Sequence, residues 1–345
     1  MPDPNLTRRP ATDPVRAYRY RDGLYAVDLL TAAVVHLDFF TWLSNHPSDA
    51  DTICRELDLA PRPVDVMLTL FAASGFIERR GDTVGVTDVA REHLSGGSPF
   101  NLAPYYASLK DRPVVQDFLR VLRTGKPAHW GGARDGHDWH TSMEDEGFAR
   151  SFTAAMDCRG LYLAQAVART VDLSAHTQLL DVGGGSGIYA CVLTASNPSL
   201  RAVVFDQAPV DRIAARLIGE RGCADRVAVR AGNFFGDAWP DDCDAHLLSN
   251  VLHDWDVDDL RTLVARSHAA LPAGGRIIIH DAFINADKTG PLPVAEYSTI
   301  LMHSTRGKCY STAEFGDALT AAGFTAIAFA ETAADRGVMT ATKAG

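Results

Sequence analysis

The chain reads Leu179-Leu180-Asp181-Val182-Gly183-Gly184-Gly185-Ser186-Gly187, and Val203-Val204-Phe205-Asp206 follows about 25 residues later. The first stretch is an apolar run that ends in an acid and continues into glycines. Glycines let the backbone approach a ligand closely at the carboxyl end of a parallel strand. Asp206 ends the second run, at the position where an acid binds ribose hydroxyls. Together the two stretches predict a nucleotide-cofactor site.

The glycine spacing separates two classes of cofactor. The dinucleotide fingerprint needs a third glycine in G-x-G-x-x-G, but Ile188 occupies that position. The order acid-x-Gly-x-Gly-x-Gly resembles instead motif I of S-adenosylmethionine (SAM) methyltransferases, whose cofactor carries no phosphate. We therefore favour a SAM methyltransferase, with a nicotinamide-dependent enzyme as the alternative.

From residue 173 onward, short apolar runs alternate with amphipathic stretches. Strands are predicted at 178–182, 201–205, 226–230, 244–249, 276–280, 325–330 and 337–342. This alternation predicts an α/β fold, a Rossmann-like seven-stranded sheet of the class I methyltransferase type.

Ligands of such sheets bind at the carboxyl ends of the strands, so the polar residues there are the candidates. The helix predicted at 146–171 joins the two halves of the chain and adds one more. The candidate cofactor-binding residues are Met156, Asp181, Gly183, Gly185, Asp206, Gln207, Asn233, Phe234, Ser249 and Asn250.

The front of the chain predicts a winged helix, with helices at 50–57 and 64–74 and a strand pair that turns at Gly81-Asp82. Acids outnumber arginines between residues 47 and 81, so the basic footprint of a DNA reader is missing. A scaffold for packing or dimerisation is favoured over a SAM-binding regulator that reads DNA. The predicted domains are a flexible arm (1–20), a winged-helix dimerisation domain (21–105), a helical connector and pocket lid (106–172) and a SAM-binding methyltransferase domain (173–345).

Composition limits the class of protein. The chain has 345 residues, 46% of them hydrophobic and 22% charged, with a net charge of -10, which indicates a globular chain long enough for two domains. The first 20 residues lack an apolar core, so we expect no signal peptide and no membrane partner. The six cysteines form no C-x-x-C pair. We expect a cytoplasmic homodimer, joined through the apolar segment 24–43, that acts on a small molecule and binds no nucleic acid.

The segments His253-Asp254-Trp255 and Gly274-Gly275-Arg276, together with the winged-helix front, resemble the plant and bacterial small-molecule O-methyltransferase family. The resemblance covers nearly the whole chain. It implies that His253 is the general base, that Asp281 orients this base, and that Phe234 packs on adenine. It also places Asn233 where the family has an acid beside adenine.

One departure from the family pattern changes the predicted chemistry. The second catalytic Glu of the family falls on Cys309, and a thiol cannot replace a carboxylate that orients the base. With His303, the pair His253 and Asp254 supplies two imidazoles and one carboxylate, the donor set of a 2-His-1-carboxylate metal site. This set resembles a smaller branch of the family, the metal-dependent C-methyltransferases of 2-oxo acids.

The resemblance to that branch implies methylation of the β-carbon of an aryl or branched 2-oxo acid, chelated to an iron or zinc ion, in antibiotic or other specialised-metabolite biosynthesis. The metal would stabilise the enolate, and metal-bound water or His253 would serve as base. The predicted catalytic set is then His253, Asp254, Asp281 and His303. The alternative is a metal-free O-methyltransferase that acts on a phenol or hydroxyl with His253 as general base.

A loop rich in histidine, tryptophan and glycine spans residues 126–142 and is predicted to fold over the pocket as a lid. A guanidinium matches the planar geometry of a carboxylate, and tryptophan offers an aromatic wall. The candidate substrate-binding residues are Arg123, Trp130 and Arg134.

Overall fold

The computed structural model describes residues 2–128 and 142–345 of the chain. These residues form two compact units. The first, here called the sheet unit, contains residues 2–16, 142–283 and 312–345. The second, the helical unit, contains residues 17–128 and 284–311.

The sheet unit contains a seven-stranded sheet with the order β5-β4-β3-β6-β7-β9-β8. Its parallel strands are β3 (Gln178–Val182), β4 (Arg201–Asp206), β5 (Val227–Ala231), β6 (Ala245–Ser249) and β7 (Arg276–Asp281). Strand β9 (Gly337–Lys343) pairs antiparallel with both β7 and β8 (Phe324–Glu331). The predicted seven-stranded α/β fold is confirmed, with the strand ends within one residue of the prediction.

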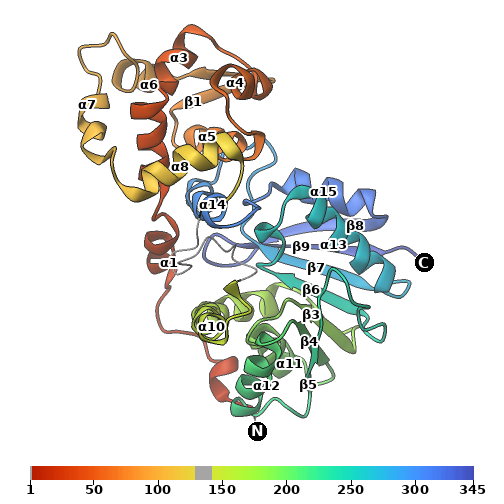
Figure 1. Cartoon of the computed structure of the whole chain (residues 1–345). Helices are drawn as coiled ribbons and strands as arrows, with labels where there is room; N and C mark the ends of the chain where they lie inside the picture. The colour runs from red at the N-terminus through yellow and green to blue at the C-terminus, as the bar shows by residue number, and fades with distance from the viewer. Residues whose placement is uncertain (1, 129–141) are drawn as a thin grey trace. The chain divides into compact units, whose positions relative to one another are not determined.

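Helices cover both faces of this sheet (Figure 1). On one face α10 (Glu146–Thr170) packs against α11 (Ile188–Ser196) and α12 (Val210–Glu220). On the other face α13 (Val257–Ala270) packs against α15 (Thr312–Ala321). The chain continues from β3 to β4 on one side and reaches β6 on the other, so the order of strands reverses at β3. Such a switch point opens a crevice at the carboxyl ends of the strands, where ligands bind.

The N-terminal residues belong to the sheet unit, and the prediction of a flexible arm is wrong for them. Pro4–Leu6 forms the short helical turn η1, and the Leu6 side chain is buried. The side-chain amide of Gln165 in α10 donates hydrogen bonds to the carbonyl oxygens of Asn5, Leu6 and Arg8 at 3.0–3.2 Å. The polar composition of this segment misled the prediction, because backbone carbonyls rather than apolar side chains attach it.

The helical unit contains the predicted winged-helix elements: α4 (Ala50–Leu57), α5 (Pro61–Ala73) and the antiparallel hairpin of β1 (Ile77–Arg80) and β2 (Thr83–Val86). The other elements are α1 (Val15–Asp22), which begins at the boundary, α2 (Ala26–Thr31), η2 (Ala32–His36), α3 (Phe39–Asn45), α6 (Asp88–His93), α7 (Ala103–Tyr106), η3 (Ala107–Leu109), α8 (Pro113–Thr124) and α14 (Leu292–Ser304). In the sheet unit the turn η4 (Leu252–Asp254) follows β6.

Two helices correct the predicted domain limits at residues 105 and 172. Helix α10, predicted as a connector, packs against α11 and α12 and so belongs to the sheet unit. Helix α14, predicted within the SAM-binding domain, packs against α5, α2 and α8 in the helical unit. Nearly all of α14 is buried. The helix therefore belongs to the unit in which it buries its apolar surface, although it lies in the second half of the sequence.

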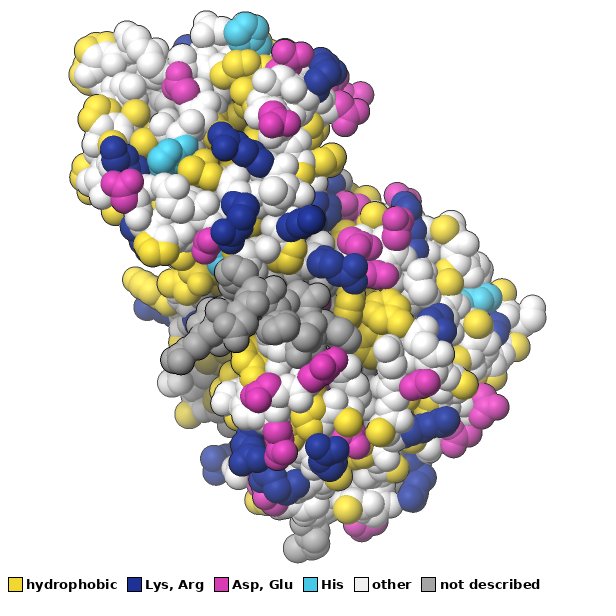
Figure 2. Space-filling model, viewed as in Figure 1, with side chains coloured by type: hydrophobic (Ala, Val, Ile, Leu, Met, Phe, Trp, Pro, Cys, Tyr) yellow, Lys and Arg dark blue, Asp and Glu magenta, His cyan; other side chains and the backbone are white. Residues whose placement is uncertain are grey.

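Acidic and basic side chains are interspersed over the surface in view (Figure 2). No single helix within residues 2–128 and 142–345 is long and apolar enough to cross a membrane, and one pair bent by 62°, Val15–His36 with Phe39–Asn45, meets that criterion only when both helices are taken together. The scaffold role of the winged helix stays a prediction.

Candidate active site

The loop that follows β3 needs glycine at three positions. Gly183, Gly185 and Gly187 have φ angles of 65°, 57° and 73°, in the left-handed region that side chains rarely adopt. A Cβ atom on Gly183 would lie 3.0 Å from a methyl of Val251, and one on Gly187 would lie 2.8 Å from Ile218. These backbone conformations therefore require glycine. The loop of residues 183–187, here called the cradle, presents mostly backbone where motif I predicts that the cofactor binds.

Asp206 ends β4 and faces this loop. Its Oδ2 accepts a hydrogen bond from the Gly185 N–H at 2.9 Å, and its Oδ1 accepts one from the Gln207 N–H at 2.8 Å. Burial raises the pKa of Asp206 to about 6, although both donors favour the charged form. The carboxylate is thus held at the edge of the cradle, where the sequence places the ribose acceptor.

Asp181 lies beneath the same loop. A Cβ atom on Gly184 would lie 2.7 Å from its carboxyl carbon, and the side chain is buried. Burial raises the pKa of Asp181 to about 7. This position makes Asp181 a support for the loop.

We expect Asp206→Asn to weaken SAM binding without unfolding the chain. The amide keeps the shape of the side chain but loses the charged acceptor that two ribose hydroxyls would share, so affinity should fall about ten- to hundred-fold. Isothermal titration of the variant with SAM measures this loss. Unchanged affinity would show that another group binds the ribose.

Aromatic rings form the predicted adenine side of the site. The Phe234 ring lies 5.9 Å from the Trp255 ring at 88°, and the Phe235 ring lies 4.6 Å from Trp255 at 77°. Phe234 also lies 3.5 Å from the position of a Cβ on Gly183, so it borders the cradle. Asn233 is partly occupied by its own turn, because its Oδ1 accepts a hydrogen bond from the Phe235 N–H at 2.8 Å.

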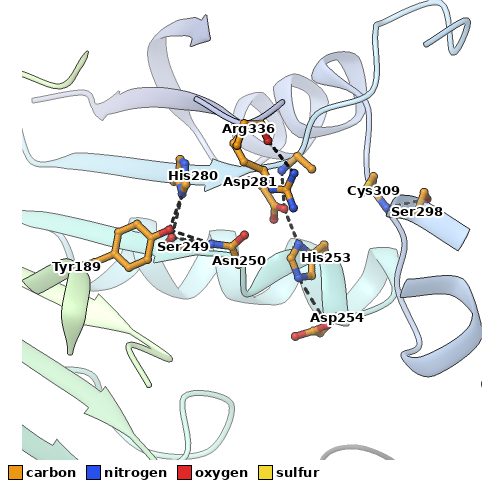
Figure 3. Close-up of polar contacts among 12 residues, drawn as sticks. Tyr189, Ser249, Asn250, His253, Asp254, His280, Asp281, Ser298, Cys309 and Arg336 are labelled. Atoms are coloured by element: carbon orange, nitrogen blue, oxygen red, sulfur yellow. Dashed lines mark hydrogen bonds and ion pairs between the residues drawn. The ribbon is translucent and has the colours of Figure 1, made fainter. Parts of the chain in front are cut away.

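His253 lies between two carboxylates in the turn after β6 (Figure 3). Its Nδ1 lies 2.5 Å from Asp281 Oδ1, and its Nε2 lies 3.7 Å from Asp254 Oδ1. Asp281 ends β7 and also accepts a hydrogen bond from the Ala282 N–H at 2.7 Å, which fixes its carboxylate. The predicted pairing of the base His253 with the acid Asp281 matches this geometry.

The two carboxylates set the electrostatics of His253. Burial lowers the pKa of the imidazole, but Asp281 and Asp254 together raise it above its ordinary value. Burial also raises the pKa of Asp254 to about 6, against the nearby charge of His253. An imidazole oriented by one carboxylate and flanked by another is suited to take up a proton and to hold it as a cation.

Reasoning from the sequence misses Arg159 of α10. Burial has the largest influence on the pKa values of His253 and Asp254, and the charge of Arg159 acts to lower both. Arg159 therefore lies within electrostatic reach of the catalytic pair. The signal in the sequence is its position three residues after Met156, one helical turn further along α10.

The predicted metal ligands are divided between the two units, with His253 and Asp254 in the sheet unit and His303 in the helical unit. His303 lies in the helical unit, where its Nε2 is 3.3 Å from Asp117 Oδ2 and its ring packs on Tyr25 at 4.9 Å. Within residues 2–128 and 142–345, no group of three His, Cys, Asp or Glu side chains is arranged to hold a metal ion. The metal site stays a prediction, and the contacts of His303 within its own unit add no support to it.

The predicted substrate-binding residues receive little further support. Arg123 is exposed at the end of α8 in the helical unit. Trp130 and Arg134, with the rest of the predicted lid from 129 to 141, lie outside the described residues.

The fold and the site together define a methyltransferase of the class I type. The O-methyltransferase domain family matches residues 119–325. A 3-hydroxy-5-methyl-1-naphthoate 3-O-methyltransferase of Streptomyces sahachiroi is 32% identical over 305 residues, which cover 87% of this chain and 86% of that protein. An O-methyltransferase family 2 protein of Planctomyces limnophilus, solved with apigenin, is 31% identical with a TM-score of 0.89 and coverage of 99% of this chain and 100% of that chain.

The human N-acetylserotonin methyltransferase, solved with SAM, shares the fold with a TM-score of 0.62 and 22% identity, over 98% of this chain and 100% of that chain. The chain belongs to the O-methyltransferase family and is a SAM-dependent methyltransferase. These matches do not support the narrower resemblance to the metal-dependent C-methyltransferases of 2-oxo acids.

Proposed function

We propose that this enzyme methylates an aromatic hydroxyl of a small natural product, such as a polyketide phenol or a flavonoid, with His253 as general base. The observation that carries the proposal is the contact of His253 with Asp281 at the carboxyl edge of the sheet. The relative from Streptomyces sahachiroi is a naphthoate O-methyltransferase, and the Planctomyces limnophilus protein was solved with a flavonoid.

The residues of the cradle fit SAM. The bare glycine loop leaves room for a ligand at the switch point, Asp206 offers a carboxylate to ribose, and Phe234 offers a ring face to adenine. When bound, SAM supplies a methyl group made electrophilic by the positive sulfonium.

The remaining steps follow from the side chains. Asp281 accepts the hydrogen bond from His253 Nδ1–H, so the lone pair lies on Nε2. Nε2 is placed to take the proton of the substrate hydroxyl, whose oxygen would accept the methyl group that SAM supplies, with S-adenosylhomocysteine (SAH) as the leaving group. Asp281 and Asp254 then stabilise the imidazolium.

Metal-dependent C-methylation, the first prediction from the sequence, is the second candidate. Its support is Cys309, which replaces a family Glu and is buried in the helical unit with its N–H bonded to Ser298 Oγ at 3.0 Å. His253 nevertheless has a carboxylate on each side of its ring, Asp281 and Asp254, so the replacement of the family Glu by Cys309 does not leave the imidazole without an acid.

Chelation separates these two candidates. We expect dialysis against EDTA and phenanthroline to leave methylation of phenols unchanged, because proton transfer to His253 needs no metal. Turnover abolished by chelators and restored by iron or zinc would contradict the metal-free mechanism.

We expect His303→Gln to lower the free energy of unfolding by about 1–3 kcal/mol, since His303 is buried between Tyr25 and Phe118.

We also propose that the enzyme is a homodimer joined through the helical unit. Tyr20, Leu24 and Val27 of the α1–α2 region are 90%, 52% and 40% exposed, and such apolar side chains gather at interfaces. Light scattering after size exclusion measures the mass. We expect twice the chain mass, and a Leu24→Glu variant should shift the protein to the monomer.

A further inference from the structure

A buried polar network lies at the carboxyl ends of β6 and β7 (Figure 3). The hydroxyls of Tyr189 and Ser249 lie 3.3 Å and 3.0 Å from His280 Nδ1. The other ring nitrogen of His280 lies 3.4 Å from Thr332 Oγ1. Burial lowers the pKa of His280 to about 3, so this ring is neutral and holds one donor and one acceptor nitrogen. The proton transfer described above uses none of these groups.

The network holds the side chain of Asn250. Its Nδ2 donates to the Tyr189 hydroxyl at 3.3 Å and to Ser249 Oγ at 3.0 Å, so both amide hydrogens are used. Its Oδ1 is buried and has no hydrogen-bond partner among the residues that the structure describes. Figure 3 shows the amide nitrogen turned toward Tyr189 and Ser249 and the oxygen turned away from them. Native proteins rarely leave a buried carbonyl unpaired, so this oxygen indicates a donor that arrives with a ligand.

The backbone of Asn250 is held in an uncommon conformation. Its φ angle is 54°, in the left-handed region, and its N–H donates to the His280 carbonyl at 2.9 Å. Residues held in this way gather at ligand sites, where the surrounding structure maintains the strain. The backbone and the side-chain network thus fix the same amide from two directions.

Asn250 lies beside the cofactor cradle. The next residue, Val251, has a methyl 3.0 Å from the position of a Cβ on Gly183, and Tyr189 is the second residue of α11, directly after the glycine loop. Strands β4 and β6 flank β3 on opposite sides. If Asp206 at the end of β4 binds the ribose of SAM, the methionine moiety would lie on the side of β6 and Asn250.

We propose that Tyr189, Ser249 and His280 form a positioning network that fixes Asn250 Oδ1 as an acceptor for the α-ammonium group of the SAM methionine moiety. The inference rests on the proposed function, because it requires SAM as the ligand. An ammonium group carries only donors, which match an unpaired acceptor, and a charge-assisted hydrogen bond is stronger than a neutral one.

The experiment compares three ligands by titration calorimetry: SAH, its analogue without the α-amino group, and its analogue without the carboxylate. Asn250→Gly removes the acceptor and suits the positive φ angle, so it should fold. We expect it to bind SAH about ten- to hundred-fold more weakly and to bind the deaminated analogue as the wild type does. Asn250→Asp keeps an acceptor oxygen and should retain SAH binding.

Tyr189→Phe tests the network, because it removes one partner of the Asn250 amide and leaves the acceptor in place. We expect a smaller loss that is again confined to ligands with the amino group. An equal loss for SAH and the deaminated analogue would overturn the proposal. A loss of affinity that disappears only for the SAH analogue without the carboxylate would also overturn it, since the Asn250 amide would then donate its NH₂ group to that carboxylate. Wild-type protein that binds no SAH would instead contradict the proposed function.

Discussion

His253→Ala should lower the rate of methyl transfer by about 10²–10⁴-fold while SAM binding is retained. In the proposed mechanism the imidazole takes up the proton of the substrate hydroxyl, whereas SAM is expected to bind on the glycine loop after β3. Single-turnover rates with saturating SAM, measured beside SAM titrations, separate chemistry from binding.

The matched control for this variant is His36→Ala, because His36 is exposed in the helical unit. We expect His36→Ala to keep the wild-type rate. His253→Gln adds a second control, since it preserves a polar side chain of similar size that cannot act as a base. A His253→Gln variant with the full rate would show that another group removes the proton.

Asp281→Asn should produce the second large loss, about 10²–10⁴-fold in the rate constant. The asparagine amide can donate to Nδ1, which would move the imidazole proton to Nε2, where the base needs its lone pair. Asp281 Oδ1 also accepts the Ala282 N–H, so an amide nitrogen turned toward Nδ1 leaves that N–H without its acceptor, and the thermal stability of the variant is measured beside its rate.

The pH profile of the same variant gives an independent readout. Activity requires neutral His253 and falls as the pH drops through its pKa. After burial, which lowers this pKa, Asp281 is the first of the charges that raise it. Its removal should therefore move the acidic limb of the profile to lower pH. Asp254→Asn is the matched control, because it makes the same substitution at the carboxylate on the other side of the His253 ring. Asp254 Oδ1 lies 3.7 Å from Nε2, farther than Asp281 lies from Nδ1, so we expect a smaller loss of rate. A larger loss for Asp254→Asn would reverse the assignment of the orienting acid.

The sheet was predictable because its information is local. Runs such as Leu179–Val182 are continuously apolar, as expected of parallel strands buried on both faces, and the glycines after them need positive φ angles. The pairing of His253 with Asp281 was implied by the resemblance to the O-methyltransferase family, and it agrees with the rule that the carboxyl ends of neighbouring parallel strands share one edge.

Other features depend on contacts that no local pattern specifies. In the helical unit His303 lies 3.3 Å from Asp117, a residue 186 positions away, and no local pattern in the sequence predicts this contact. Gln165 attaches the N-terminal segment through three backbone carbonyls, which have no sequence signature. Nothing in the sequence distinguishes Tyr189 and His280 from ordinary core residues, and only the fold shows that they lie around Asn250.

The site of methylation tests the central claim most directly. The enzyme, stripped of metal, is incubated with SAM labelled with ¹³C in the methyl group and with hydroxylated naphthoates or flavonoids, and the product is examined by NMR. The account predicts a labelled methyl on a phenolic oxygen, one SAH for each product, and no product from His253→Ala. A label on the β-carbon of a 2-oxo acid, formed only after iron or zinc is added, would contradict it.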